Sequence, residues 1–484
     1  MNMERMLQET TARYPENIAI IYEGTSFTYQ ELDRFVDALA FHLQDQGVRK
    51  GDKVAIMLGN CPEFVITYFA ALRLGAIAVT LNVMSTSYEL QHLLENCEAK
   101  VFVTAENLAR RYHAISDTLP LCRHLITTTG LNPESPFDEM VRSGLAPENP
   151  PALQGSDPAV MVYTAGLMGK PLGAVLTYQN LATQADLLRA ICGGTKDDRS
   201  LAVIPLFHTF GASVNMLCPL RLGGTIVLMD RFTMEGIFAA IHNHQVTYIT
   251  AVPRLFMGML FHERGKEYNL RSLRLGITGG SPMPPELFAA FEKHLGIRVL
   301  EGYGLTETSP CCIFSRPDQA QKPGSIGTVL PGVAAKVVDE EGCEVRACMQ
   351  GELLVRGNCV MQGYYNDAAA TAEVLRDGWL HTGDLAYMDE EGYVFLTGIK
   401  KRMIITSGFN VYPKEVEMIL EMHPAVTAAK VIGEKDPMRG ELVKALIVRK
   451  PGSPVDEKEI ILHCRTYLSA YKAPREVTFV AALD

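Results

Sequence analysis

The chain has 484 residues, of which 47% are hydrophobic and 21% are charged, a composition typical of a globular protein. Its length exceeds what one hydrophobic core supports, so we expect at least two domains. The formal net charge of -10 argues against nucleic acid as a partner, because phosphates attract basic surfaces.

Two features of the sequence bear on its cellular compartment. No apolar run approaches the roughly 20 residues of a membrane-spanning helix, and Glu4, Glu9 and Glu16 stand where a secretory signal would be apolar. The 11 cysteines are scattered without a Cys-x-x-Cys pair, which favours reduced, buried thiols over a disulfide framework or a cysteine metal site. We therefore expect a soluble cytoplasmic protein with no integral membrane segment.

Strand and helix patterns alternate along the first part of the chain. Residues 53–58 (KVAIML) predict a strand, and residues 62–74 (PEFVITYFAALRL) predict a helix after it. Further strands are predicted at residues 77–81, 100–104, 201–205, 225–229, 247–252 and 273–278. Such alternation is typical of α/β layers with largely parallel strands.

The pattern changes between residues 317 and 397, where short strands are separated by Gly and Asp. Asp-Glu-Glu-Gly occurs at Asp339 and again at Asp389, and such turns predict hairpins in an antiparallel subdomain. A new α/β pattern follows, with a helix at 413–423 and strands at 428–432 and 444–448. We place the domain boundary at the basic cluster Lys400, Lys401 and Arg402, which gives domains of residues 1–400 and 401–484.

Two glycine turns are candidates for phosphate binding. The first, YTAGLMGKPLG from Tyr163, follows an apolar run, and its backbone N–H groups can approach phosphate oxygens, although its spacing is not that of a Walker loop. In the second, EGYGLTET, Thr306 can donate to a phosphate oxygen and Glu307 offers a hard oxygen ligand for Mg²⁺. Tyr303 can present an aromatic face to a purine. The structural alternatives are a plain turn and a helix start capped by Thr306.

Three further segments place polar residues at turns. Asp384 ends WLHTGD, where its carboxylate can accept hydrogen bonds from both hydroxyls of a ribose. In SGFNVYPKEVE, which begins at Ser407, Gly408 can admit a narrow ligand close to the backbone before Pro413 opens a helix. His208 lies among aromatic residues in PLFHTFG, a setting more typical of a packed core histidine.

The order and spacing of these segments closely resemble the adenylate-forming superfamily of acyl-CoA synthetases, luciferases and peptide-synthetase adenylation domains. The resemblance runs from YQEL at Tyr29 to YKAPR at Tyr471. It implies a large N-terminal domain of two α/β layered subdomains plus a small β-barrel-like subdomain, followed by a small mobile C-terminal α+β domain. It also implies an AMP-forming acyl-CoA synthetase, in which ATP and Mg²⁺ convert a carboxylic acid to an acyl-adenylate and coenzyme A displaces AMP.

The resemblance also implies roles for individual residues. Thr306 would hold the α-phosphate, Glu307 the magnesium and Asp384 the ribose. His208 would gate the acyl pocket, and Arg402 would be the hinge between the domains. The other cofactor-binding residues that it implies are Thr164, Gly166, Gly169 and Lys170 in the phosphate loop, Gly279, Gly280, Ser281, Glu301, Gly302 and Tyr303 around the adenine and acyl sites, and Ser407 and Gly408 beside the pantetheine tunnel.

The phosphate loop departs from the family's pattern, TSGTTGxPKG. The serine of that pattern is Ala165 here, its threonines are Leu167 and Met168, and its lysine is Leu172. A charged hydrogen bond contributes on the order of 1.5–3 kcal/mol, so these losses weaken the hold on the β- and γ-phosphates. The family's ribose-binding arginine is Ile399, and the sequence ends before the family's Gly-Lys motif, so we expect the small domain to be truncated.

Three functions stay open. We favour an acid–thiol ligase for a hydrophobic acid, fatty or aryl, because Thr306, Glu307 and Asp384 persist together. The alternative is a degenerate homologue that binds or processes acyl-adenylate or acyl-CoA without using ATP. A third function, the loading of a carrier protein, has less support because the chain contains no carrier domain. A homodimer is an expectation from the family alone.

Overall fold

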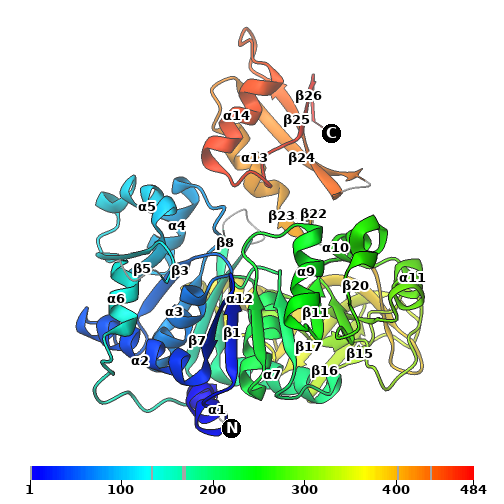
Figure 1. Ribbon diagram of the computed structural model, residues 1–484. Coiled ribbons are helices and arrows are strands. Elements are labelled where there is room, and N and C mark those ends of the chain that lie inside the picture. The colour runs from blue at the N-terminus through cyan, green and yellow to red at the C-terminus, as the bar shows by residue number, and fades with distance from the viewer. Residues whose placement is uncertain (1–2, 132–134, 166–170, 400–402, 437–438, 484) are drawn as a thin grey trace.

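The computed structural model describes residues 3–131, 135–165, 171–399, 403–436 and 439–483. Three β-sheets form a large N-terminal body and a fourth forms a small C-terminal domain, so the predicted α/β class with a large and a small domain is confirmed (Figure 1). The boundary predicted at residues 400–402 falls outside the described residues and stays a prediction. In the described part of the chain, no helix combines the length and the apolar character needed to cross a membrane.

The first sheet has seven strands, with helices on both faces. Val54 and Ile56 point into the cluster under one set of helices, whereas Ala55 and Met57 point to the other, because successive side chains leave a strand on opposite faces. The strands, in spatial order, are β18 (Gly363–Tyr364), β8 (Pro171–Thr177), β7 (Pro158–Ala165), β4 (Ile77–Thr80), β3 (Lys53–Met57), β5 (Ala99–Ala105) and β6 (His124–Thr128). One face carries α2 (Tyr29–Asp45), α3 (Pro62–Arg73) and α6 (Pro136–Arg142), and the other carries α4 (Ser87–Asn96) and α5 (Glu106–His113).

The second sheet has nine strands and includes an N-terminal hairpin that the sequence patterns did not predict. Its strands, in spatial order, are β15 (Thr328–Val329), β14 (Ile313–Phe314), β13 (Arg298–Tyr303), β12 (Leu275–Thr278), β11 (Tyr248–Ala251), β9 (Arg199–Ala202), β10 (Thr225–Leu228), β1 (Ile18–Tyr22) and β2 (Thr25–Thr28). One face carries α9 (Met234–His244), α10 (Pro253–Phe261) and α11 (Pro285–Leu295), and the other carries α7 (Tyr178–Cys192), the π-helix η3 (Gly211–Leu217) and α8 (Cys218–Leu222). β1 pairs in parallel with β10, so the N-terminus is part of this sheet.

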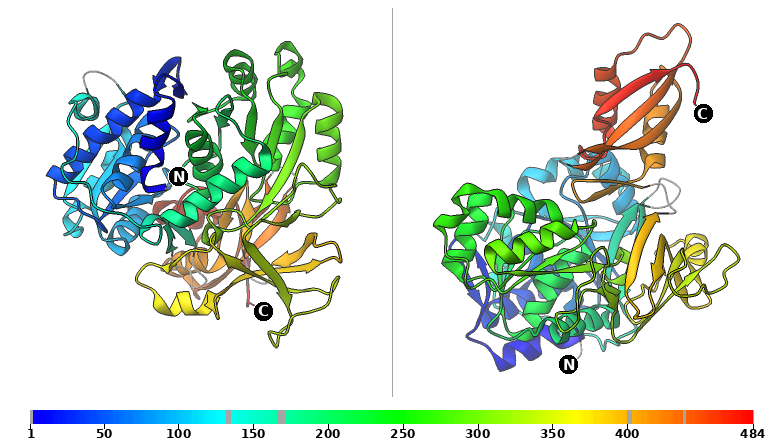
Figure 2. Two further views of the ribbon diagram at one scale, coloured as in Figure 1. Left: turned by 90° about the horizontal axis from the view of Figure 1, so that it is seen from below. Right: turned by 90° about the vertical axis from the view of Figure 1, so that its right-hand side faces the viewer.

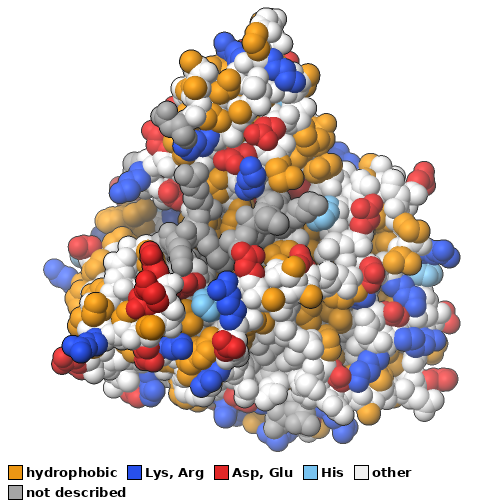
Figure 3. Space-filling view, turned by 180° about the vertical axis from the view of Figure 1, so that it is seen from behind, with side chains coloured by type: hydrophobic (Ala, Val, Ile, Leu, Met, Phe, Trp, Pro, Cys, Tyr) orange, Lys and Arg blue, Asp and Glu red, His pale blue; other side chains and the backbone are white. Residues whose placement is uncertain are grey.

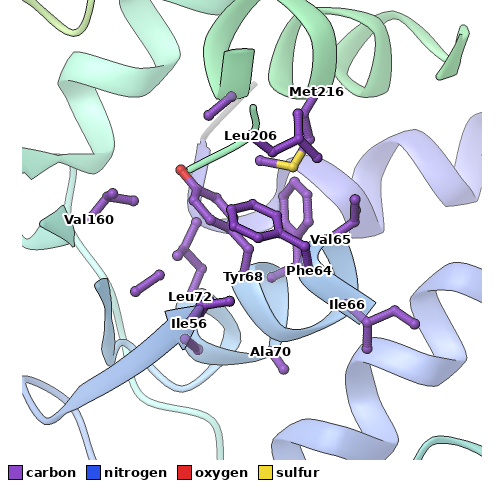
Figure 4. Packing of buried hydrophobic residues seen from close by; sticks show 14 of the residues in the cluster. Ile56, Phe64, Val65, Ile66, Tyr68, Ala70, Leu72, Val160, Leu206 and Met216 are labelled. Atoms are coloured by element: carbon purple, nitrogen blue, oxygen red, sulfur yellow. The ribbon is translucent and has the colours of Figure 1, made fainter. Parts of the chain in front are cut away.

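One buried cluster joins the two large sheets. The rings of Phe64 and Tyr68 on α3 stack with centroids 6.2 Å apart, and Leu206 and Met216, which follow β9, pack in the same cluster (Figure 4). Each such side chain contributes about 1.5–3 kcal/mol when it is fully removed from water. The two sheets therefore share one hydrophobic core.

The third sheet is antiparallel, as predicted for residues 317–397, although β15 and β18 of that stretch join the second and the first sheet. The turn at Asp389 joins two of its strands as a hairpin, whereas the turn at Asp339 pairs only Val338 with Glu344. Beyond this pair the chain turns away from β16, and the backbone N–H of Cys348 donates instead to the backbone carbonyl of Met388 at 2.7 Å. The elements of this subdomain are β16 (Val333–Val338), β17 (Gly351–Gly357), α12 (Ala368–Val374), β19 (Leu375–Arg376), β20 (Trp379–Met388) and β21 (Val394–Ile399).

The C-terminal domain has a hydrophobic core of its own, built from residues between 404 and 477. It projects from the large body as a separate lobe (Figures 2 and 3). Its elements are β22 (Ile404–Thr406), β23 (Phe409–Val411), α13 (Pro413–Glu421), β24 (Val426–Asp436), β25 (Gly440–Arg449), α14 (Glu457–Tyr467) and β26 (Glu476–Val480).

The carboxyl ends of four parallel strands, β9, β11, β12 and β13, meet at one edge of the second sheet. Strand β9 ends at Ala202 rather than at the predicted residue 205, which frees the following residues to form a loop. Ligands of open α/β sheets bind beyond the carboxyl ends of the strands. The loops after these strands carry His208, Val252, Gly279 and Thr306, so we expect a ligand site at this edge.

Candidate active site

A cavity of about 860 Å³ lies where the carboxyl ends of both large sheets meet the third sheet and the C-terminal domain. Its size is that of a small-molecule site. The predicted site residues that line it are Thr164, His208, Gly279, Gly280, Ser281, Glu301, Gly302, Tyr303, Thr306, Glu307, Asp384, Ser407 and Gly408. The predicted residues Gly166, Gly169, Lys170 and Arg402 lie outside the described residues.

One end of the cavity is polar and is organised by Tyr303 and Asp384. The hydroxyl of Tyr303, at the end of β13, donates to Oδ2 of Asp384 at 2.5 Å. Asp384 lies within β20 rather than in the predicted turn, and its backbone N–H donates to Oγ1 of Thr382 at 3.1 Å around Gly383, whose φ is 73°. Burial, and then the nearby carboxylate of Asp384, raise the pKa of Tyr303 well above its ordinary value, so the phenol stays a donor. An aromatic ring and an acceptor carboxylate suit a base and a sugar hydroxyl.

Glu301 is a buried carboxyl group in the wall of the same end of the cavity, 7% exposed. Burial raises its pKa to about 7, although the backbone N–H of Met283, which donates to Oε1 at 3.2 Å, acts in the opposite direction. Near neutral pH this group therefore exists in both protonation states. A protonated carboxyl group can donate a hydrogen bond as well as accept one.

Thr306 and Glu307 lie in a 3₁₀ turn, η5 (Thr306–Thr308), directly after β13. The cap is made by Thr308, whose Oγ1 accepts from the backbone N–H of Leu305 at 2.7 Å, so the structural alternative in which Thr306 is the cap does not hold. The sequence offered two hydroxyls within three positions, and the tighter 3₁₀ geometry selects the second. Among the described residues, the Thr306 hydroxyl has no hydrogen-bond partner, and it faces the cavity.

The carboxylate of Glu307 is held by Tyr364, whose hydroxyl donates to Oε1 at 2.7 Å. The backbone carbonyl of Glu307 accepts from the N–H of Met361 at 2.8 Å. Within the described ranges, no group of three or more His, Cys, Asp or Glu side chains is placed to hold a metal. A single fixed carboxylate suits Mg²⁺, which is commonly shared between one or two carboxylates and substrate phosphates.

His208 lies in a row of aromatic rings. Its ring centroid is 4.6 Å from that of Phe207 and 5.9 Å from that of Phe409, and Phe409 stacks at 4.7 Å on Tyr471. Burial lowers the pKa of His208 to about 4, so the imidazole is neutral at physiological pH. The row crosses from the large body, which carries His208, to the C-terminal domain, which carries Phe409.

The turn between β22 and β23 brings Ser407 and Gly408 to the cavity. Gly408 has a φ of 85°, and a Cβ atom there would lie 3.1 Å from Cγ1 of Val252 in the large body. Glycine is therefore needed both for the left-handed backbone and for the close approach of the two domains. The hydroxyl of Ser407 is buried and has no hydrogen-bond partner among the described residues.

The phosphate-loop side is described only at its flanks. Thr164 is the next-to-last residue of β7, and its side chain hydrogen-bonds with Tyr412, whose pKa is raised by burial against the effect of that bond. Leu172, which replaces the lysine of the family's pattern, pairs with Thr164 across the β7–β8 ladder. The flank therefore offers Thr164 as a polar group and Leu172 as an apolar one.

Sequence reasoning missed several residues of the site. Tyr364 and Tyr412 hydrogen-bond with Glu307 and Thr164, and their local sequences, GYY and NVYP, carry no pattern that indicates such a role. Glu89 and Lys472 also line the cavity, although 383 positions separate them in the chain. A contact between such distant residues has no local signature.

Family models match both parts of the chain. Residues 7–365 match the model described as AMP-binding enzyme, and residues 415–484 match the AMP-binding enzyme C-terminal domain. Among curated relatives, a long-chain-fatty-acid–CoA ligase of Bacillus subtilis (strain 168) is 34% identical, covering 99% of this chain and 90% of that protein. A feruloyl-CoA synthase of an Amycolatopsis species is 35% identical, covering 97% of this chain and 93% of that protein.

A solved structure extends the comparison to both domains. An o-succinylbenzoate CoA synthetase from Bacillus subtilis, a double mutant bound with its product analogue, superposes with a TM-score of 0.89 at 31% identity. The match covers 99% of this chain and 95% of that one. The arrangement of the two domains is therefore similar in the two proteins.

Proposed function

The chain belongs to the AMP-binding enzyme family over both of its domains, and on that premise we propose how its cavity joins a hydrophobic carboxylic acid to coenzyme A. The observation that carries the proposal is the continuity of the cavity. It extends from Tyr303 and Asp384, past Thr306 and Glu307, to Ser407 and Gly408 on the other domain. A nucleotide, an acid and a thiol can therefore meet in one space.

The reaction has two steps because a carboxylate resists attack by a thiol. In the first step, a carboxylate oxygen attacks the α-phosphorus of ATP, the bond to the bridging oxygen breaks, and pyrophosphate leaves. In the second step, the thiol sulfur attacks the acyl carbon, the acyl–phosphate bond breaks with AMP as leaving group, and the thiol proton is released. Both steps gain from holding the reactants in line, an effect worth up to about 7–11 kcal/mol of barrier.

The roles of individual residues follow from their places in the cavity. Asp384 accepts from the ribose hydroxyls while Tyr303 fixes its carboxylate and borders the base. The unpartnered hydroxyl of Thr306 donates to the α-phosphate. Gly279, Gly280, Ser281, Glu301 and Gly302 form the wall between the adenine and acyl sites, and Thr164 is the described part of the phosphate loop.

Glu307 is proposed to hold Mg²⁺ together with phosphate oxygens of ATP. The donor set fits that ion, because one carboxylate oxygen is fixed by Tyr364 and carboxylate oxygen is a ligand that Mg²⁺ prefers. The ion would supply positive charge against the pyrophosphate leaving group. The hydrogen bond from Tyr364 keeps the carboxylate aimed at the cavity.

The acid is proposed to be hydrophobic because one arm of the cavity is apolar. Phe210, Val214, Ile277, Cys311 and Phe314 line this arm and belong to the cluster beneath η3. The ring of Phe210 lies close to Gly279, where a Cβ atom would be 3.4 Å from it. Fatty and aryl acids both suit such walls.

Ser407 and Gly408 are proposed to border the pantetheine arm of coenzyme A. In this orientation of the C-terminal domain, the turn that carries them closes one side of the cavity, and His208 lies beside Phe409 at the junction. One similar structure that contains both domains, with a TM-score of 0.89, is that of a synthetase bound with its product analogue. The orientation therefore suits the second step.

Three further proposals concern the whole chain. All 11 cysteines are unpaired, which suits the reducing cytoplasm. The division into residues 1–400 and 401–484, with a hinge near Arg402, is supported by the separate core of the C-terminal domain. A homodimer is proposed from the family and can be checked by sedimentation velocity.

The function is tested by supplying each step with its own substrate. With ATP, Mg²⁺, coenzyme A and a panel of fatty and aryl acids, the protein should release AMP and pyrophosphate and form a thioester. Separately, a synthetic acyl-adenylate and coenzyme A should give the thioester without ATP. If the thioester forms only in the second assay, the result would favour the degenerate homologue. If it forms in neither assay, the proposal is refuted.

A further inference from the structure

A buried lysine in the wall of the cavity lies between two carboxylates from different domains. Nζ of Lys472 donates to Oε1 of Glu89 at 2.8 Å and to Oε1 of Glu415 at 2.7 Å. Lys472 and Glu415 belong to the C-terminal domain, whereas Glu89 lies in the first turn of α4 in the large body. The ion pair of Lys472 with Glu415 can therefore move as one block, and the pair with Glu89 exists only when the domains meet in this orientation.

The second oxygen of Glu89 is also occupied. Oε2 accepts from Oγ of Ser469 at 2.6 Å and from the backbone N–H of Thr86 at 2.9 Å. The hydroxyl of Thr86, the residue that caps α4, donates to the carbonyl of Tyr467 at 2.7 Å, and the Tyr467 ring packs edge-on against Tyr88 with centroids 5.2 Å apart. One helical turn of the large body thus contacts the end of α14 and the segment after it.

All three charged side chains are removed from water, with exposed fractions of 7% for Glu89, 8% for Lys472 and 7% for Glu415. Burial raises the pKa of a carboxyl group, yet the charge of Lys472 and its hydrogen bonds hold the pKa of Glu89 below its ordinary value. The pKa of Glu415 is raised, by burial first, and Oε2 of Glu415 has no hydrogen-bond partner among the described residues. Both carboxylate oxygens of Glu89 are therefore hydrogen-bonded, whereas only Oε1 of Glu415 is, through Lys472.

The ion pair between Glu89 and Lys472 adds little to stability. It instead favours one orientation of the C-terminal domain over others. A buried ion pair gains little over hydrated charges, because desolvation offsets most of the attraction. A buried carboxylate that lacks its partner, however, is strongly unfavourable. When the domain turns away, Glu89 returns to water while Lys472 keeps Glu415, so leaving this orientation costs little. Docking in a nearby but incorrect orientation would bury Glu89 without a partner.

We propose that Glu89 is a positioning residue for the thiol step: through Lys472 and Ser469 it sets the orientation in which Ser407 and Gly408 border the cavity. The proposal rests on the proposed function for the identity of that step. It predicts that the loss of the Glu89 charge impairs thioester formation and leaves adenylate formation unchanged, because Glu89 contacts the other domain only in this orientation.

The experiment compares Glu89→Gln with Glu95→Gln, a matched change on the same helix at an exposed residue that is bonded to Gln91. In the Glu89→Gln protein, thioester formation from a synthetic acyl-adenylate and coenzyme A should fall at least tenfold, while acid-dependent ATP–pyrophosphate exchange stays within twofold of wild type. Glu95→Gln should change neither rate. An unchanged thioester rate, or an equal fall of both rates with a lower melting temperature, would overturn the proposal.

A second measurement does not depend on activity. Hydrogen exchange followed by mass spectrometry should show faster exchange of residues 86–90 and of the 467–472 segment in Glu89→Gln, and no change there in Glu95→Gln. Equal exchange in wild type and Glu89→Gln would overturn the positioning role even if the wild-type protein makes no thioester. Wild-type protein that is inactive in both steps but shows the expected exchange would instead refute the proposed function alone.

Discussion

The phenolic hydroxyl of Tyr303 donates to Oδ2 of Asp384 at 2.5 Å and so ties the second sheet to the third at the polar end of the cavity. Tyr303 ends β13 and Asp384 lies within β20, and 81 positions separate them. A single hydrogen bond therefore sets the distance between the aromatic wall and the acidic acceptor of the proposed nucleotide site.

Asp384→Asn should weaken nucleotide binding. The amide keeps the shape of the side chain but removes the charge, and charged hydrogen bonds contribute about 1.5–3 kcal/mol. We expect the KM for ATP to rise tenfold or more in an AMP-release assay. Tyr303→Phe is the control, because it keeps the ring and the carboxylate and should show a smaller rise. Equal KM values in wild type and Asp384→Asn would contradict the ribose role.

Glu307→Gln should change the Mg²⁺ dependence of the first step. The amide is a poorer ligand for a hard cation than a carboxylate. We expect the Mg²⁺ concentration for half-maximal pyrophosphate exchange to rise at least tenfold, with a smaller effect on thioester formation from a synthetic acyl-adenylate. Tyr364→Phe, which removes only the supporting hydrogen bond, should give an intermediate value. An unaltered Mg²⁺ titration in Glu307→Gln would argue against a metal at this position.

Glu301→Gln should stabilise the protein in a pH-dependent manner. Burial raises the pKa of Glu301 to about 7, so the folded protein binds this proton more tightly than the unfolded chain does. The free energy of unfolding therefore falls as the pH rises from the ordinary carboxyl range towards 7, and the full penalty is present above pH 7. The variant should be more stable than wild type at pH 8, by roughly 3 kcal/mol.

This difference should shrink as the pH falls towards 5, and denaturant titrations at both pH values would measure it. Glu340→Gln, at an exposed turn, is the control and should show no such trend. A constant difference between wild type and Glu301→Gln from pH 5 to pH 8 would mean that Glu301 is not the group with the raised pKa.

His208→Phe should keep most of the activity. Burial lowers the pKa of His208 to about 4, so the ring is neutral over the working range and contacts Phe207 and Phe409 as an aromatic group. We expect the thioester rate to stay within about fivefold of wild type and the pH–rate profile between 5.5 and 8 to keep its shape. A profile that loses an inflection in this range would assign proton transfer to His208.

Gly408→Ala should impair the second step. A Cβ atom at Gly408 would lie 3.1 Å from Val252 across the domain junction, and the backbone is left-handed there. Gly452 has a similar φ but open space around it, so Gly452→Ala carries the same backbone strain, of order 1 kcal/mol, without the clash. The thioester rate should fall at least tenfold more in Gly408→Ala than in Gly452→Ala.

Local patterns in the sequence predicted most of the elements that carry the site. The strands before Gly279 and after residue 53 were found from apolar runs, since a buried parallel strand must be apolar on both faces. The turns with Thr306 and Ser407 were found from glycine next to polar residues, whereas Asp384, which was predicted at a turn, lies within strand β20. The alternative with Thr306 as the cap does not hold, because propensity alone does not distinguish it from Thr308.

Contacts between distant segments could not be predicted in this way. The pairing of β1 with β10 joins Ile20 to Ile226, and the Glu89–Lys472 bond joins residues 383 positions apart. Neither leaves a periodic signal in one sequence, because each depends on how separately formed elements pack. The π-helix that begins at Gly211 could not be predicted either, because its residues also suit an α-helix.

The separate hydrophobic core of the C-terminal domain decides what a change of orientation costs. Val411, Val416, Ala445 and Ile460 lie in a core built by the lobe alone, so a reorientation would expose the contacts between the domains, such as Glu89 with Lys472, and would leave this core covered. A change in the orientation of such a lobe would therefore require no partly unfolded state, because the stability of its core is separate from the strength of its contacts with the large body.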